Sequence, residues 1–215
     1  MRILILIGAS FILGSIPCGV IIARVKGVDL KKIGSGNIGA TNVLRSLGKG
    51  AAVLTLLGDV LKGTAAVAMA RVFVSAHGFP VIEFGGWTLQ SDPLATIEGL
   101  AGLSAILGHN FSLFLRFKGG KGVATSLGVL VIYSPQAAML TLTIWLVATL
   151  ITKYSSLGAI VSFGLLPVNV FLFDPVGIKV LISAMITLFI LVKHIGNIER
   201  LIKGAERKIG ERSSS

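Results

Sequence analysis

The stretch GVATSLGVLVIYSPQAAMLTLTIWLVATLIT, residues 122–152, contains no charged side chain and decides the fold. A helix that crosses the hydrocarbon core of a bilayer needs about 20 mostly apolar residues. The stretch is therefore too long for one ordinary span and too short for two full ones. Ser134-Pro135 interrupts it, and proline breaks or kinks a continuous helix. We interpret it as a short helix over 122–133 and a full-length helix over 136–152.

The charges around the other apolar stretches support this division. With two helices over 122–152 the chain has seven spans, and sixteen of its 20 Lys and Arg residues fall on one side, in segments 24–49, 116–121, 153 and 193–215. Cytoplasmic loops of membrane proteins carry an excess of Lys and Arg. A single kinked span would instead leave the basic tail outside. The pattern therefore places the N-terminus outside and the C-terminus in the cytoplasm.

The composition agrees with a membrane protein. Of the 215 residues, 53% are hydrophobic and 13% are charged, whereas a soluble domain has about 25% charged residues. We predict a single all-α domain over 1–215, a polytopic integral membrane helix bundle, with a short hairpin or interfacial piece in the outward loop 76–92. The seven transmembrane spans are expected at 3–25, 50–75, 93–115, 122–133, 136–152, 155–173 and 175–193, followed by a basic cytoplasmic tail over 194–215.

The net charge of +11 has two interpretations. In a soluble protein it would suggest nucleic acid binding. In a membrane protein the cations follow from the orientation of the spans, so no nucleic acid partner is expected, while anionic substrates stay compatible. The single cysteine, Cys18, permits no intrachain disulfide, and we interpret it as a small packing residue.

The first inward loop ends in the motif GSGNIGATNVLR, residues 34–45. It matches the G-x-G-x-x-G pattern of dinucleotide-binding proteins, but the charged residues 29–32 stand where that motif requires a buried strand. What remains is a loop that offers backbone N–H groups, the Ser35 hydroxyl and the Arg45 guanidinium to an anion. A tight interhelical turn is the alternative interpretation.

The second inward loop, RFKGGKG over 116–122, leads into the short helix. It is not a Walker A motif, because Gly122 stands where that motif carries Ser or Thr. Free N–H groups at a helix start, with Lys118 and Lys121 nearby, favour phosphate binding. We prefer phosphate binding to a merely flexible loop. The orientation of the spans accounts for the basic residues of this loop, but it does not require three glycines in four residues.

Polar residues also mark the third inward loop and the tail. Ser156 lies in the short loop 153–156, and His194 and Asn197 share one face of a helix because they are three residues apart. Glu206 follows in the tail, where it is compatible with a helix-surface charge. All four inward segments contribute polar groups and the outward loops almost none, so we predict one anion-binding site at the cytoplasmic surface.

Asp59 and Lys62 are three residues apart within the second span. Ionisable groups inside a membrane are costly and usually paired. We expect an ion pair that faces the bundle, and a wall of the polar site is the second interpretation.

With these residues, the sequence resembles the bacterial acyl-phosphate:glycerol-3-phosphate acyltransferase family over nearly its whole length. The resemblance rests on Gly14-Ser15-Ile16-Pro17, Gly34–Arg45, Asp59 with Lys62-Gly63, Gly108-His109, Phe117–Thr125, His194, Asn197 and Glu206. Three departures are visible: Ser112 replaces a common proline, Ile195 replaces a usual basic residue, and the loop 76–92 is longer than typical.

The resemblance implies transfer of a fatty acyl group from a long-chain acyl phosphate to the sn-1 hydroxyl of glycerol 3-phosphate. The products are lysophosphatidic acid and phosphate, in the first step of phospholipid synthesis. No cofactor and no metal are implied, because the acyl phosphate already carries a good leaving group and the enzyme must position substrates and stabilise charge. A monomer in the bacterial cytoplasmic (inner) membrane is expected, with its acyl substrate among membrane lipids and its active site on the cytoplasmic side.

The resemblance also implies roles for individual residues. Catalytic roles fall to Ser35, His194 and Asn197, and the last two orient the glycerol hydroxyl. Either His194 or a substrate phosphate oxygen takes the hydroxyl proton. Substrate phosphate binding falls to Ser35, Gly36, Asn37, Arg45, Lys118, Gly119, Gly120, Lys121, Gly122 and Ser156. Supporting roles fall to Asp59, Lys62, His109 and Glu206.

Two other classes of membrane protein fit the sequence less well. A small transporter of phosphate esters or other organic anions is the main alternative, but alternating access predicts polar groups on the outward loops as well. A CDP-alcohol phosphotransferase requires an acidic metal cluster, and the first half of the membrane region supplies only Asp59.

Overall fold

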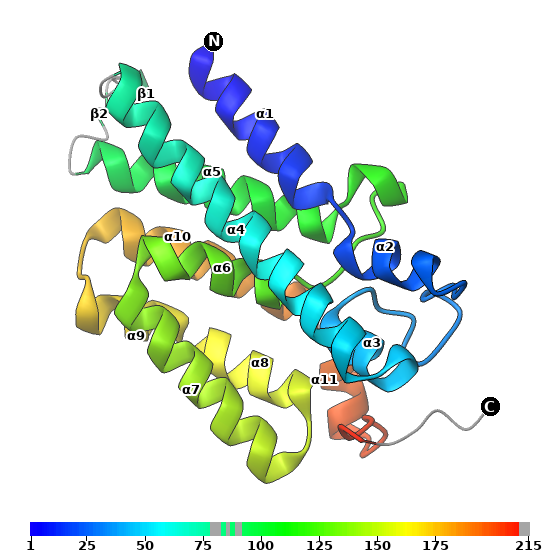
Figure 1. Ribbon diagram of the computed structural model, residues 1–215. Coiled ribbons are helices and arrows are strands. Elements are labelled where there is room, and N and C mark those ends of the chain that lie inside the picture. The colour runs from blue at the N-terminus through cyan, green and yellow to red at the C-terminus, as the bar shows by residue number, and fades with distance from the viewer. Residues whose placement is uncertain (78–82, 85–86, 89–91, 211–215) are drawn as a thin grey trace.

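The computed structural model describes residues 1–77, 83–84, 87–88 and 92–210, which form a bundle of helices (Figure 1). The helices are α1 (Arg2–Ser15), α2 (Cys18–Val25), α3 (Ala40–Leu47), α4 (Lys49–His77), α5 (Pro93–Asn110), α6 (Val123–Tyr133), α7 (Pro135–Thr152), α8 (Ser155–Gly164), α9 (Leu166–Phe173), α10 (Gly177–Lys193) and α11 (Ile195–Ile202), with a 3-10 turn η1 (Leu113–Leu115). In the outward loop, β1 (Glu83–Phe84) and β2 (Trp87–Thr88) pair antiparallel, so the expected hairpin is present. The all-α class is confirmed.

Each of the seven expected spans is occupied by helix in the described part of the chain. Three helical stretches there are long and apolar enough to cross a membrane: Arg2–Val25, α4 and α7. The number is five if each of two bent pairs, α8 with α9 and α10 with α11, counts as one span. α5 and α6 occupy the two remaining positions. The count of seven crossings and their direction stay predictions.

The first expected span, 3–25, is divided into α1 and α2. Pro17 lies at the division, because proline has no N–H to continue a helical ladder. The Ile16 carbonyl at this break accepts a hydrogen bond from Lys62 Nζ at 2.9 Å. A charged group from the second span thus stabilises the break in the first.

The expected span 155–173 is also bent, by 45° between α8 and α9. Pro167 lies in the first turn of α9 and has no N–H to donate to the Phe163 carbonyl. The Thr187 hydroxyl of α10 donates to that carbonyl instead, at 2.7 Å. The neighbouring helix therefore satisfies the group that proline leaves unpaired, as expected for broken helices in membranes.

The expected span 93–115 is too long, because α5 ends at Asn110 and the chain turns through η1. Ser112 holds this turn: its hydroxyl donates to the Ser15 carbonyl at 2.5 Å. The serine that replaces the family's common proline therefore connects the turn to the end of α1.

The short helix α6 packs tightly against α4. An added Cβ at Gly63 would lie 2.2 Å from the Thr125 carbonyl oxygen, and one at Gly128 would lie 2.0 Å from the Val60 carbonyl oxygen. Small residues at such contacts let two helix backbones approach closely. This approach fixes the start of α6 beside α4. α3 and α11 lie at the end of the bundle away from β1 and β2 (Figure 1).

Candidate active site

The first inward loop folds around the side chain of Asn42, a buried residue of α3. The Asn42 Oδ1 atom accepts a hydrogen bond from the Ser35 N–H at 2.8 Å. Its Nδ2 atom donates to the carbonyls of Asn37 at 2.8 Å and Ile33 at 3.2 Å. Gly34 adopts a φ of 61°, and an added Cβ there would lie 2.2 Å from Asn42 Oδ1. One amide therefore sets the path of the loop, and the Ser35 side chain is exposed.

The second inward loop packs on the end of α5. The Gly120 N–H donates to the His109 carbonyl at 3.0 Å. An added Cβ at Gly119 would lie 2.0 Å from that carbonyl oxygen, and one at Gly120 would lie 2.2 Å from His109 Nε2. Packing on His109 therefore requires glycine at both positions, whether or not these residues also contact a ligand. Gly122, with a φ of 84°, then starts α6.

Behind this loop lies the expected buried ion pair. Lys62 Nζ lies 2.8 Å from Asp59 Oδ1, and both side chains are almost fully buried. His109 Nδ1 lies 3.5 Å from the same oxygen. The pair faces the bundle, and it contacts His109, the residue on which the second loop packs. This arrangement fits a supporting role.

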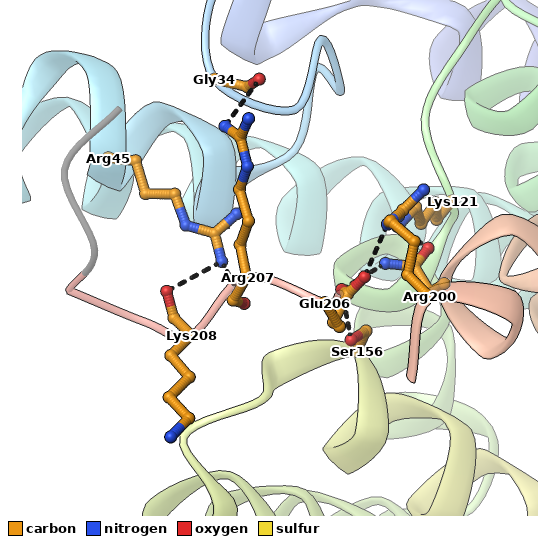
Figure 2. A network of polar contacts seen from close by, with 9 residues as sticks. Gly34, Arg45, Lys121, Ser156, Arg200, Glu206, Arg207 and Lys208 are labelled. Carbon is orange, nitrogen blue, oxygen red and sulfur yellow. Dashed lines mark hydrogen bonds and ion pairs between the residues drawn. The ribbon is translucent and has the colours of Figure 1, made fainter. Parts of the chain in front are cut away.

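A carboxylate of the tail lies among polar groups from three segments (Figure 2). Glu206 Oε1 accepts hydrogen bonds from Ser156 Oγ at 2.7 Å and Asn197 Nδ2 at 2.6 Å, and Oε2 accepts one from Arg200 Nε at 2.8 Å. The interpretation of Glu206 as a helix-surface charge is wrong. α11 ends at Ile202, and the chain beyond it turns this carboxylate inward.

These contacts set the protonation state of Glu206. Burial by itself raises the pKa of its carboxyl, but the hydrogen bonds from Ser156, Asn197 and Arg200 more than offset it and lower the pKa below its ordinary value. The carboxylate is therefore ionised at neutral pH and can accept all three hydrogen bonds.

Lys121 enters the same network from the second loop. Its Nζ atom donates to Asn197 Oδ1 at 2.5 Å. Burial lowers the pKa of Lys121 to about 8, Glu206 opposes that shift, and Arg200 and Arg45 add to it. Lys121 is therefore mostly charged at neutral pH and loses its charge in mildly alkaline solution.

His194 lies between α10 and α11 and is 2% exposed. Its Nδ1 atom lies 2.8 Å from the Ile190 carbonyl oxygen. A carbonyl only accepts hydrogen bonds, so in this assignment Nδ1 carries the hydrogen and Nε2 keeps a lone pair. The His194 carbonyl accepts from the Asn197 N–H at 2.8 Å, which keeps the two residues together as expected.

Arg45 connects the first loop to the tail. Its Nη2 atom donates to the carbonyls of Arg207 at 3.0 Å and Lys208 at 3.3 Å. In return, Arg207 Nη1 donates to the Gly34 carbonyl at 3.1 Å (Figure 2). The tail therefore contacts the first loop through both its main chain and a side chain.

The structure brings several of the predicted site residues into one network and leaves others at its edge. Those joined are Arg45, Lys121, Ser156, His194, Asn197 and Glu206. Gly36 and Asn37 belong to the loop that Asn42 organises. Within the described residues, no hydrogen bond or ion pair engages the Lys118 ammonium or the Ser35 hydroxyl, and both side chains are exposed.

Three residues of the network were missed by the sequence analysis: Asn42, Arg200 and Arg207. Asn42 lies inside the quoted motif, and an amide side chain shortly after the glycine-rich turn was the available signal. Nothing in the sequence separates Arg200 and Arg207 from the other tail cations.

The network is strongly positive. It contains four cations, Arg45, Lys121, Arg200 and Arg207, and one carboxylate, that of Glu206, which is paired with Arg200 (Figure 2). Guanidinium and ammonium groups, with a serine hydroxyl among them, are the donors that phosphate esters require. The surplus of positive charge suits one or two phosphate groups.

Comparison with known proteins gives a consistent result. Residues 3–204 match the family model described as glycerol-3-phosphate acyltransferase. The glycerol-3-phosphate acyltransferase of Sinorhizobium fredii is 42% identical over 97% of this chain and 93% of the relative. That of Nitrosospira multiformis is 42% identical over 100% of both chains.

Solved structures show the same relation. The crystal structure of PlsY, an integral membrane glycerol 3-phosphate acyltransferase, in its glycerol 3-phosphate form matches with a TM-score of 0.85 and 36% identity, covering 98% of this chain and 96% of that one. Its lysophosphatidic acid form matches with a TM-score of 0.83 and 35% identity over the same shares of the two chains. With four inward segments joined in one cationic network and this similarity over nearly the whole length, the chain belongs to the glycerol-3-phosphate acyltransferase family.

Proposed function

We propose that the protein transfers a fatty acyl group from an acyl phosphate to the sn-1 hydroxyl of glycerol 3-phosphate, releasing lysophosphatidic acid and inorganic phosphate. One observation carries the proposal: polar groups from four inward segments meet in a network that has four cations and one carboxylate. Both substrates carry phosphate, so this surplus of positive charge matches their combined charge. Membership of the family favours this activity over anion transport.

The cations hold the two substrates with the hydroxyl directed at the acyl carbon. Arg45 and Lys121 come from separate segments, so they can engage two different phosphates at once. Ser156 supplies a hydroxyl beside them. Positioning of two bound reactants accounts for a large share of enzymatic rate, because a reaction between two free molecules becomes effectively unimolecular.

In the reaction, the sn-1 oxygen forms a bond to the acyl carbon and the bond from that carbon to the phosphate oxygen breaks. The phosphate departs with the electron pair, and the hydroxyl proton goes to a base. His194 Nε2 has a lone pair for this proton in the assigned tautomer. A substrate phosphate oxygen is the other acceptor. Asn197, held by Lys121 and Glu206, orients the hydroxyl.

The proposal includes a location. Seven spans with the N-terminus outside place the network at the cytoplasmic face of the bacterial inner membrane, where glycerol 3-phosphate is soluble. The acyl chain then lies among the lipids between the helices. Burial of an apolar chain there is favourable, and it leaves the phosphate at the interface.

The test uses purified full-length protein with glycerol 3-phosphate and either palmitoyl phosphate or palmitoyl-CoA. We expect lysophosphatidic acid from palmitoyl phosphate and none from the thioester. Product from the CoA thioester alone would overturn the assignment of acyl phosphate as the donor. No product with either donor would overturn the proposed acyltransferase activity.

A further inference from the structure

The chain beyond α11 runs across the site and is held at both ends. The Ala205 N–H donates to the Arg200 carbonyl at 2.8 Å. The Ile209 N–H donates to the Lys153 carbonyl at 2.8 Å. Residues 205–209 therefore bridge α11 and the third inward loop, and Arg207 lies at the middle of this bridge.

The side chain of Arg207 acts on one peptide group of the first loop. Its Nη1 atom donates to the Gly34 carbonyl at 3.1 Å. The N–H of the same peptide group belongs to Ser35 and donates to Asn42 Oδ1 at 2.8 Å. Both ends of the Gly34–Ser35 peptide are thus held, so its plane cannot rotate without loss of a hydrogen bond. The orientation of Ser35 depends on this peptide.

The main chain of Arg207 acts on Arg45. Its carbonyl and that of Lys208 accept hydrogen bonds from Arg45 Nη2. The Arg45 guanidinium is therefore directed by the same short segment that fixes Ser35 (Figure 2). Ser35 and Arg45 are two of the first-loop residues that we expect to bind a substrate phosphate.

Arg207 has the features of a residue that positions others. It is exposed, and among the described residues no carboxylate forms an ion pair with it. Its positive charge therefore adds to that of Arg45, and the two like charges repel each other when no anion is bound. A residue kept only for stability would gain more from a carboxylate than from a neutral carbonyl.

We propose that Arg207 is a positioning residue of the active site, which fixes the Gly34–Ser35 peptide through its side chain and Arg45 through its main chain. This rests on the proposed function, because it assigns the first loop to a substrate phosphate. Arg207 does not touch the reacting atoms. It acts through Ser35 and Arg45.

The test compares Arg207→Ala, Arg207→Lys and a matched control, Lys203→Ala, in the full-length protein. Lys203 is also an exposed cation, at the end of α11, and its ammonium makes no hydrogen bond or ion pair within the described residues. Amide hydrogen exchange should rise over 33–39 in Arg207→Ala and stay unchanged over 119–126. The kcat/KM for a phosphorylated substrate should fall by about tenfold or more, as for loss of a hydrogen bond from a charged group. Arg207→Lys should recover part of the loss, and Lys203→Ala should stay within about twofold of wild type.

A double-mutant cycle separates positioning from a change in folding. In a Ser35→Ala background, Arg207→Ala should cause little further loss, because the Arg207 side chain acts through the Gly34–Ser35 peptide on Ser35. Additive losses would overturn the proposal. So would unchanged exchange over 33–39, or faster exchange without a kinetic effect.

The experiments distinguish a wrong assignment of Arg207 from a wrong proposed function. If wild type forms no lysophosphatidic acid from palmitoyl phosphate, the proposed function falls. Hydrogen exchange and the rise in unfolding temperature caused by inorganic phosphate then decide the role of Arg207. A phosphate-induced rise as large in Arg207→Ala as in wild type would overturn it, and a smaller rise supports it.

Discussion

The side-chain amide of Asn197 is engaged at both ends, by Lys121 at Oδ1 and by Glu206 at Nδ2. Such an amide cannot rotate without the loss of two charge-assisted hydrogen bonds, which are stronger than neutral ones. His194, one turn earlier, is likewise held through Nδ1 by the Ile190 carbonyl. The two residues expected to orient the glycerol hydroxyl are therefore fixed before substrate binds, and substitution of a single side chain in this network should have a measurable effect.

His194→Gln tests the base directly. If His194 Nε2 takes the hydroxyl proton, the substitution should lower kcat by about 10²–10⁴-fold, the usual contribution of a general base. Steady-state rates of lysophosphatidic acid formation across a pH series measure this effect, and the unfolding temperature serves as the control. Activity close to wild type at every pH would assign the proton to a substrate phosphate oxygen.

Lys121 should give the reaction an alkaline limit. The pKa of Lys121 is lowered to about 8 by burial, so its charge is present below that pH and is lost above it. The kcat/KM should therefore fall as pH rises through about 8, because this parameter reports the free enzyme. The fall in kcat should occur at higher pH, since bound phosphate favours the charged form.

Lys121→Arg is the matching variant, because a guanidinium stays charged throughout this range. Its kcat/KM should show no decline near pH 8, whatever its absolute value. An unchanged alkaline limit in Lys121→Arg would mean that another group sets it.

At the scale of helices, glycine contacts place the start of α6. The second loop leads into α6, and α6 in turn touches α4 through Gly63 and Gly128. The short length of α6, Val123–Tyr133, lets its start lie inside the bundle beside the buried Asp59–Lys62 pair. Helix starts with this geometry attract phosphate. Packing of α6 on α4 therefore determines where the second loop can bind an anion.

Gly63→Ala should destabilise the protein, because its Cβ would lie 2.2 Å from the Thr125 carbonyl oxygen, a backbone atom that cannot move aside. Overpacking of this kind costs about 1–3 kcal/mol. Gly50→Ala in the same helix is the control, since nothing lies within 4 Å of its added Cβ. Thermal unfolding in detergent, followed by circular dichroism, should separate the two variants. Equal unfolding temperatures would show that α4 and α6 can move apart without cost.

At the scale of the molecule, segments from the beginning, middle and end of the chain meet at one end of the bundle. The tail is the common partner: Glu206 contacts the third loop and α11, and Arg207 contacts the first loop. The second loop joins through Lys121. This arrangement requires all four segments to lie on the same side of the membrane, although they alternate with helices that are predicted to cross it.

Labelling of single cysteines tests this arrangement. In a Cys18→Ala background, cysteines at Lys32 and Lys118 should react with a membrane-impermeant maleimide only after right-side-out vesicles are opened. A cysteine at Arg2 should react in intact vesicles. Lys32 and Lys118 are exposed, so access is limited by the bilayer rather than by burial. Reaction of the cysteines at Lys32 and Lys118 from opposite faces of the membrane would contradict the proposed topology and the shared site.

Much of the fold could be predicted from the sequence because a bilayer acts on each segment separately. Apolar length and the positions of Lys and Arg are local properties, and the predicted spans coincide with helices. The breaks at Pro17 and Pro167 were missed, because their stabilisation depends on Lys62 and Thr187 from other helices. The polar loops were identified from glycine, hydroxyl and cation content alone, and their binding of an anion stays a prediction.

The sequence by itself determined the class of the protein, its helical segments and the four polar segments of the site. Only the tertiary structure decided which side chains meet: that Asn42 sets the first loop, that His109 requires Gly119 and Gly120, and that Glu206 turns inward. The physical reason is distance along the chain. Hydropathy and charge act within a segment, whereas a hydrogen bond between Arg207 and Gly34 exists only once packing has brought these two distant segments together.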